Sequence, residues 1–103
     1  MKFRDKAHRN DFHRDTLCAY PGASMVITRG VKPNKEAVLS ALVEFKGFTP
    51  GDDPYGEHDF GAFDVDGTRY YFKWEDWTDV PVDMALPEGM GPLLLTVMRA
   101  DEY

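Results

Sequence analysis

The dipeptide Asp66-Gly67 is the feature that most restricts how this chain can fold, because it stands between two runs of alternating residues. A two-residue turn of type I′ needs positive φ angles at both positions, and Asp-Gly is among the pairs that adopt them most readily. The flanking runs, residues 58–65 and 68–75, alternate as strands do. The sequence therefore predicts an antiparallel β-hairpin over residues 58–75.

A turn of two residues also fixes which residues face one another across the hairpin. One set of pairs carries most of the aromatic rings and should face the core: Val65–Thr68, Phe63–Tyr70, Gly61–Phe72 and Asp59–Trp74. The alternate set should face solvent or a partner: Asp64–Arg69, Ala62–Tyr71, Phe60–Lys73 and His58–Glu75. Gly61 leaves room for the opposing ring. Because a buried unpaired carboxylate is costly, we expect Asp59 to accept hydrogen bonds from residues 49–57 or to point into a cleft.

Apolar periodicity and β-prone composition predict two helices and two further strands, joined by loops rich in proline and glycine. These are helices 4–18 and 34–46, strands 24–28 and 93–99, and irregular connections 49–57 and 78–92. The nearly continuous apolar run of the last strand favours a central position in the sheet. We expect one α+β domain over residues 1–103, with a mainly antiparallel four-stranded sheet and two helices packed on one face.

Length and composition agree with a small globular protein. A chain of 103 residues with 43% hydrophobic content can bury one core without disulfides. Its one cysteine, Cys18, cannot form an intramolecular disulfide, which suits a reducing compartment. Residues 1–15 are charged throughout and the sequence has no long apolar run, so we expect a cytoplasmic protein without membrane attachment.

The net charge of −6 is unevenly distributed along the chain. Residues 1–35 carry a net charge of +5, whereas residues 36–103 carry −11. Such a negative body is a poor ligand for nucleic acid, so we expect no direct nucleic-acid binding. It can attract a basic protein surface, including one that normally holds nucleic acid. Solubility alone is the simpler interpretation of the charge.

Residues 52–59 concentrate four carboxylates, a tyrosine and a histidine within eight positions. Glu57, His58 and Asp59 could hold a divalent metal ion, although their spacing matches no metal motif. His58 and Glu75 could act as a base and its orienting acid, although no nucleophile accompanies them. A hydrogen-bonded loop is the simpler interpretation. We therefore expect no cofactor, and keep catalysis and metal binding as alternatives.

The segment from Asp53 to Gly67, DPYGEHDFGAFDVDG, closely resembles the hallmark of a small bacterial domain family of unknown function, frequent on plasmids and other mobile elements. Shorter matches extend the resemblance over nearly the whole chain: Asn10-Asp11, Thr16-Leu17, Val26-Ile27-Thr28, Gly30-Val31, Phe72-Lys73 with Glu75, Leu95-Thr96-Val97-Met98 and Glu102-Tyr103. This chain departs from the family pattern at two places. His13 stands where an aromatic residue is usual, and Asp76-Trp77 replaces a pair of tyrosines.

The resemblance implies no reaction, but its mobile-element context suggests a protein that counters host defences such as restriction or CRISPR systems. Together with the negative charge, this predicts a non-enzymatic inhibitor whose protein partner is a nucleic-acid-handling defence complex. The expected contact residues are Asp52, Asp53, Tyr55, Glu57, Asp76, Trp77 and Asp79. The alternatives are a metal-assisted hydrolase or nuclease and a structural accessory protein of a mobile element.

Overall fold

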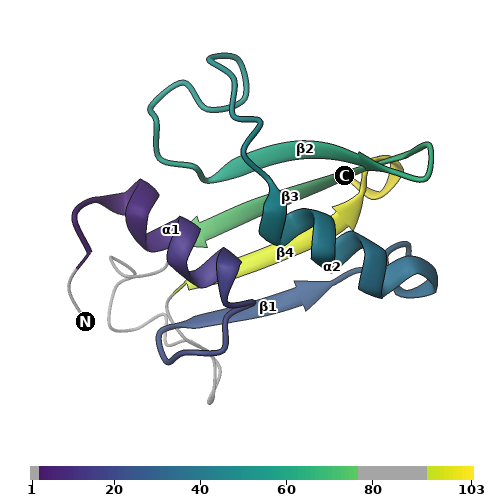
Figure 1. Ribbon diagram of the computed structural model, residues 1–103, viewed down its shortest axis with the longest axis horizontal. Coiled ribbons are helices and arrows are strands. Elements are labelled where there is room, and N and C mark those ends of the chain that lie inside the picture. The colour runs from purple at the N-terminus through teal and green to yellow at the C-terminus, as the bar shows by residue number, and fades with distance from the viewer. Residues whose placement is uncertain (1–2, 77–92) are drawn as a thin grey trace, which may run out of the picture.

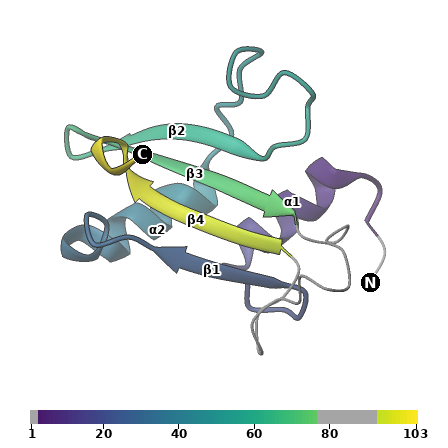
Figure 2. The ribbon, with the colours of Figure 1, turned by 180° about the vertical axis from the view of Figure 1, so that it is seen from behind.

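The computed structural model describes residues 3–76 and 93–103. Its elements are helices α1 (Lys6–Asp15) and α2 (Lys35–Glu44), strands β1 (Ala23–Ile27), β2 (Phe60–Val65), β3 (Thr68–Asp76) and β4 (Leu93–Arg99), and the short 3-10 helices η1 (Lys32–Asn34) and η2 (Ala100–Glu102). Both α-helices lie against one face of the sheet (Figure 1), and no described α-helix covers the reverse face (Figure 2). The predicted α+β class and the placement of both helices are confirmed.

The four strands form one mixed sheet in the order β1-β4-β3-β2. β1 runs parallel to β4, and the other two pairings are antiparallel. The central position predicted for residues 93–99 is confirmed, because β4 lies between β1 and β3. None of the described helices has the length and apolar composition needed to cross a membrane.

The hairpin has the predicted register over six pairs, from Val65–Thr68 at the turn to Phe60–Lys73. Asp66 and Gly67 have φ angles of 51° and 79°, as a turn of two left-handed residues requires. The backbone N–H of Trp74 also donates to the Asp59 carbonyl at 2.8 Å.

The predicted pairing of His58 with Glu75 is wrong. The chain leaves the strand at His58, whose φ is 54°, and the ladder with β3 starts only at Phe60. Glu75 instead pairs with Leu94 on the other side of β3. The alternating strand pattern of β2 therefore does not continue back to His58, contrary to the prediction from the sequence.

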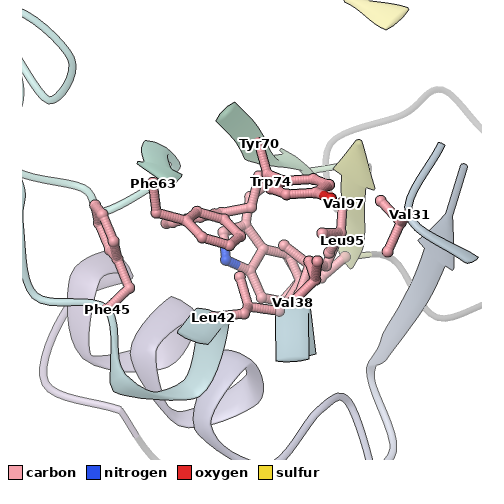
Figure 3. Packing of buried hydrophobic residues seen from close by; sticks show 11 residues of the cluster. Val31, Val38, Leu42, Phe45, Phe63, Tyr70, Trp74, Leu95 and Val97 are labelled. Atoms are coloured by element: carbon pink, nitrogen blue, oxygen red, sulfur yellow. The ribbon is translucent and has the colours of Figure 1, made fainter. Parts of the chain in front are cut away.

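The aromatic face of the hairpin forms the core, as predicted. Its buried rings pack against side chains from α2 and β4, from Phe45 just after α2 and from Val31 just before η1 (Figure 3). The cluster consists of Phe63, Tyr70, Phe72 and Trp74 from the hairpin, with Val31, Val38, Leu42, Phe45, Leu93, Leu95 and Val97. A Cβ atom at position 61 would collide with the rings of Phe72 and Phe45. The expected role of Gly61 in making room for a ring is therefore confirmed.

Both helices are shorter than predicted. Helix α1 begins after Asp5, whose side chain accepts a hydrogen bond from the backbone N–H of His8 at 2.8 Å. It ends at Asp15, and Leu17 and Cys18 have left-handed backbone angles that end the segment before residue 18. The residues of the predicted 78–92 connection, together with Trp77, lie outside the described part of the chain.

Candidate functional site

Helix α1 buries polar side chains, which is unusual for a helix that covers a sheet. Asn10, His13 and Arg14 are all buried. Asn10 donates a hydrogen bond from Nδ2 to the Glu57 carbonyl at 2.9 Å, and Arg14 donates from Nη2 to the Phe45 carbonyl at 3.1 Å. These two bonds attach α1 to both ends of the segment that joins α2 to β2.

His58 is held by carboxylates at both ring nitrogens. Its Nδ1 lies 2.9 Å from the carboxylate of Asp11, and its Nε2 lies 3.7 Å from Oδ2 of Asp53. Asp53 has a side chain only 6% exposed and also accepts the backbone N–H of His58 at 3.0 Å. Both ring nitrogens of His58 therefore face carboxylates. Glu75 is not one of these partners, which argues against the catalytic His58–Glu75 alternative.

Phe48 and His58 close the base of the 49–57 loop. Their rings stack with centroids 3.9 Å apart and planes 8° from parallel. Inside the loop, the Thr49 carbonyl accepts the backbone N–H of Asp53 at 2.7 Å, and the Asp53 carbonyl accepts that of Gly56 at 3.2 Å. The loop projects beyond β2 as a teal trace (Figure 1). Its conformation is thus fixed by its own hydrogen bonds and by the contacts at its base.

Arg14 lies in a cage of aromatic rings below this base. Its guanidinium carbon is 5.2 Å from the ring centroids of both Phe48 and Phe72, and 5.7 Å from that of Phe45. Nη2 also lies 3.4 Å from Oδ1 of Asp11. Burial lowers the pKa of Arg14, and the nearby carboxylates oppose that shift. The Nε and Nη1 atoms have no hydrogen-bond acceptor among the described residues.

An open pocket of about 870 Å³ lies at the base of the loop, between α1 and the end of α2. Its lining combines three acids, two bases, a histidine and apolar side chains: Asp11, Arg14, Asp15, Val43, Glu44, Phe45, Lys46, Phe48 and His58. A hollow of this volume is in the range of about 300–1,000 Å³ that ligand pockets occupy. The pocket and the loop share Phe48 and His58, so they form one continuous surface.

The predicted contact residues are divided by the structure. Tyr55 is 86% exposed and Asp52 is also exposed, whereas buried Asp53 has a structural role in the loop. Glu57 lies 4.0 Å from the ammonium of Lys6, and Asp76 lies 3.0 Å from the guanidinium of Arg9. Trp77 and Asp79 lie outside the described residues. Cations of the positive N-terminal part thus neutralise part of the acidic surface.

The residues proposed for the alternative metal site do not converge. Within residues 3–76 and 93–103, no group of three or more His, Cys, Asp or Glu side chains could hold a metal ion, so Glu57, His58 and Asp59 form no such group. Cys18 offers no reactive thiol, because burial raises its pKa to about 11.

Sequence reasoning missed the residues of α1 that organise the site. Asn10, Asp11 and Arg14 were not identified as candidates, because polar side chains on a helix normally face solvent. The one sequence signal for two of them was the Asn10-Asp11 match within the family resemblance.

Comparison with known proteins gives a family without an assigned activity. Residues 25–102 match the family described as "Protein of unknown function (DUF3768)". No curated protein and no solved structure matches the chain. The matched range includes the 49–57 loop and the whole hairpin, whereas α1, which anchors the loop, precedes it. The chain belongs to the DUF3768 family of proteins of unknown function.

Proposed function

We propose that this protein acts by binding another protein through the 49–57 loop, with Tyr55 as the central contact residue. The observation that carries the proposal is the contrast within the loop. Its base is fixed by the His58–Asp11 contact and the Phe48–His58 stack, whereas Tyr55 is 86% exposed. Exposed aromatic side chains are typical binding hot spots, and a loop that is already ordered loses little conformational entropy on binding.

The charge of the loop favours a partner with a basic surface. Residues 49–57 contain three acids and no Lys or Arg, and Asp52 is exposed at its outer part. Electrostatic complementarity of this kind speeds association and selects among partners. A basic surface that normally holds nucleic acid fits this requirement. The mobile-element context of the resembling family favours a restriction or CRISPR enzyme, which the bound protein would inhibit by occupying that surface.

Catalysis receives less support from the geometry. Both ring nitrogens of His58 face carboxylates, and no reactive nucleophile lines the pocket beside it. Binding therefore accounts for the arrangement with fewer assumptions than a hydrolase does.

The test is affinity capture from a bacterial lysate with the wild-type protein and two tyrosine variants, Tyr55→Ala and Tyr103→Ala. Tyr103 is the matched control, because it is 76% exposed and contacts Phe60 and Tyr71 rather than the loop. We expect a partner that Tyr103→Ala retains and that Tyr55→Ala recovers about tenfold less or worse. Capture should also decrease as salt is raised. Equal recovery by Tyr55→Ala would contradict the proposal.

A further inference from the structure

The pocket at the base of the loop carries two carboxylates at unfavourable positions. Asp15 is the last residue of α1 and Glu44 is the last residue of α2, and both line the pocket. The C-terminal end of a helix carries a partial negative charge, so an acid there weakens the helix. Neither carboxylate forms a hydrogen bond or an ion pair within 4.0 Å of another described residue, although the charge of Asp15 helps to raise the pKa of Arg14 against the effect of burial. The last turn of α2 contains no basic side chain.

Arg14 adds buried hydrogen-bond donors without acceptors beside the pocket. Its side chain is 4% exposed and lines the same pocket, yet Nε and Nη1 have no acceptor among the described residues. Buried donors without acceptors are rare in folded proteins, because each one loses its hydrogen bond to water. The aromatic rings around Arg14 compensate its charge only in part. A ligand that displaced the side chains covering these donors and supplied an uncharged acceptor beside Arg14 would satisfy them.

We infer that this pocket binds a lysine- or arginine-containing peptide segment of the protein partner. A basic peptide brings both missing groups, since its side-chain cation meets Asp15 and Glu44 and its backbone carbonyl supplies the acceptor for Arg14. A simple inorganic cation would satisfy the carboxylates alone. Arg14 and the exposed Lys46 are cations of the lining and oppose such a ligand, but the carboxylates of Asp11, Asp15 and Glu44 outnumber them.

The inference rests on the proposed protein-binding function and assigns a second contact to it. Phe48 and His58 belong both to the base of the loop and to the pocket, so one partner can contact Tyr55 and fill the pocket together. The loop would then supply an aromatic anchor and the pocket a site selective for positive charge. This arrangement gives a role to the carboxylates of Asp15 and Glu44, which lack a hydrogen bond or ion pair among the described residues.

The pocket can be tested without knowledge of the partner. The full chain, labelled with ¹⁵N, is titrated with the peptide acetyl-Gly-Lys-Gly-Lys-Gly-amide and with its counterpart in which glutamate replaces lysine. We expect the lysine peptide alone to shift the backbone resonances of residues 11–15 and 44–48. The double variant Asp15→Asn/Glu44→Gln should bind it about five- to tenfold more weakly, as expected for the loss of two partly exposed charge pairs.

The control variant is Glu36→Gln, which makes the same chemical change at the opposite end of α2. It should bind the lysine peptide as the wild type does. Equal weakening by Glu36→Gln would show that net charge alone is responsible and would overturn the inference. So would the absence of binding, or equal binding of the glutamate peptide. Thermal unfolding of each variant establishes that all are folded.

The outcomes separate this inference from the proposed function. A partner that is lost by Tyr55→Ala but retained by Asp15→Asn/Glu44→Gln would overturn the pocket inference and leave the loop proposal intact. Specific binding of the lysine peptide, together with retention of every partner by Tyr55→Ala, would overturn the loop proposal and leave the pocket inference intact. In that case the pocket would remain a peptide site and the loop would lose its proposed role.

Discussion

The Glu102 carboxylate accepts a hydrogen bond from Thr28 Oγ1 at 2.6 Å, although 74 positions separate the two residues in the sequence. The same carboxylate accepts the backbone N–H groups of Gly30 and Arg99, each at 2.9 Å. It thereby joins the segment after β1 to the end of β4. A Cβ atom at position 30 would collide with this carboxylate, so glycine is required for the contact.

We expect Glu102→Gln to reduce the acid sensitivity of the fold. The hydrogen bond from Thr28 is the largest of the effects that lower the pKa of Glu102 below its ordinary value of 4.5. A carboxyl whose pKa is lower in the folded state stabilises the fold above about pH 4.5, and this contribution is lost as the pH falls through the folded-state pKa. Urea unfolding between about pH 5 and 3 should therefore show a shallower pH dependence for the variant. Glu36→Gln, a change at an exposed residue, should retain the wild-type slope.

Substitution of Gly61 should destabilise the core by overpacking. The added methyl group of Gly61→Ala would collide with the rings of Phe72 and Phe45, which pack among buried neighbours. Overpacking of this kind costs about 1–3 kcal/mol of unfolding free energy. Gly51→Ala is the control, since its Cβ would meet nothing closer than Thr49 Oγ1 at 4.0 Å. If chemical denaturation gave both variants the same stability, the packing assigned to Gly61 would be incorrect.

His13 should make the protein less stable as the pH falls below about 6.5. Burial is the main cause that lowers its pKa in the folded state, and the charge of Arg9 adds to the effect. Below about pH 6.5, His13 is therefore protonated more readily in the unfolded chain than in the folded one. The free energy of unfolding decreases as the pH falls toward the folded-state pKa.

The variant His13→Phe tests this, because the imidazole already packs among the rings of Phe3, Phe12 and Trp74. It should fold and should lose the pH dependence between about pH 7 and 5. It also removes Nδ1, a buried atom without a hydrogen-bond partner in the described structure. An unchanged pH profile of unfolding would show that His13 does not determine this dependence.

The contact between His58 and Asp11 should control the order of the 49–57 loop. His58→Phe can retain the stack on Phe48 but removes both carboxylate contacts, and it leaves the buried Asp53 side chain without a ring partner. Asp53 still accepts the backbone N–H of residue 58, but the lost hydrogen bond to the Asp11 carboxylate is of a kind that contributes about 1.5–3 kcal/mol. Amide hydrogen exchange at Asp53 and Gly56 should therefore accelerate, while exchange in β3 stays slow. His8→Phe, at an exposed histidine of α1, should leave loop exchange unchanged.

The hairpin could be predicted closely because local chemistry determines it. The Asp66-Gly67 turn fixes the register, and alternation then assigns each side chain to a face without reference to the rest of the protein. The final strand was equally clear, since a nearly continuous apolar run indicates a central position in the sheet, and β4 lies between β1 and β3. Where a single local rule was sufficient, the structure agrees with the sequence.

The candidate site could not be predicted in the same way, because distant residues determine it. Alternation placed His58 in a strand. In the structure His58 instead has a left-handed backbone angle, and its ring nitrogens face the carboxylates of Asp11 and Asp53. The early end of α1 likewise depends on left-handed angles at Leu17 and Cys18, where no glycine signals the change. Such positions depend on tertiary contacts that periodicity does not detect.

The pairing of Asp76 with Leu93 has a consequence for how this protein can be modified. These two residues face each other across β3 and β4, so the ends of the two described segments lie side by side at one end of the paired strands. The free energy of closing a connection between two fixed points rises only slowly with its length. Asp76 and Leu93 are therefore suitable attachment points at which an engineer could join a foreign sequence of chosen length to the described scaffold.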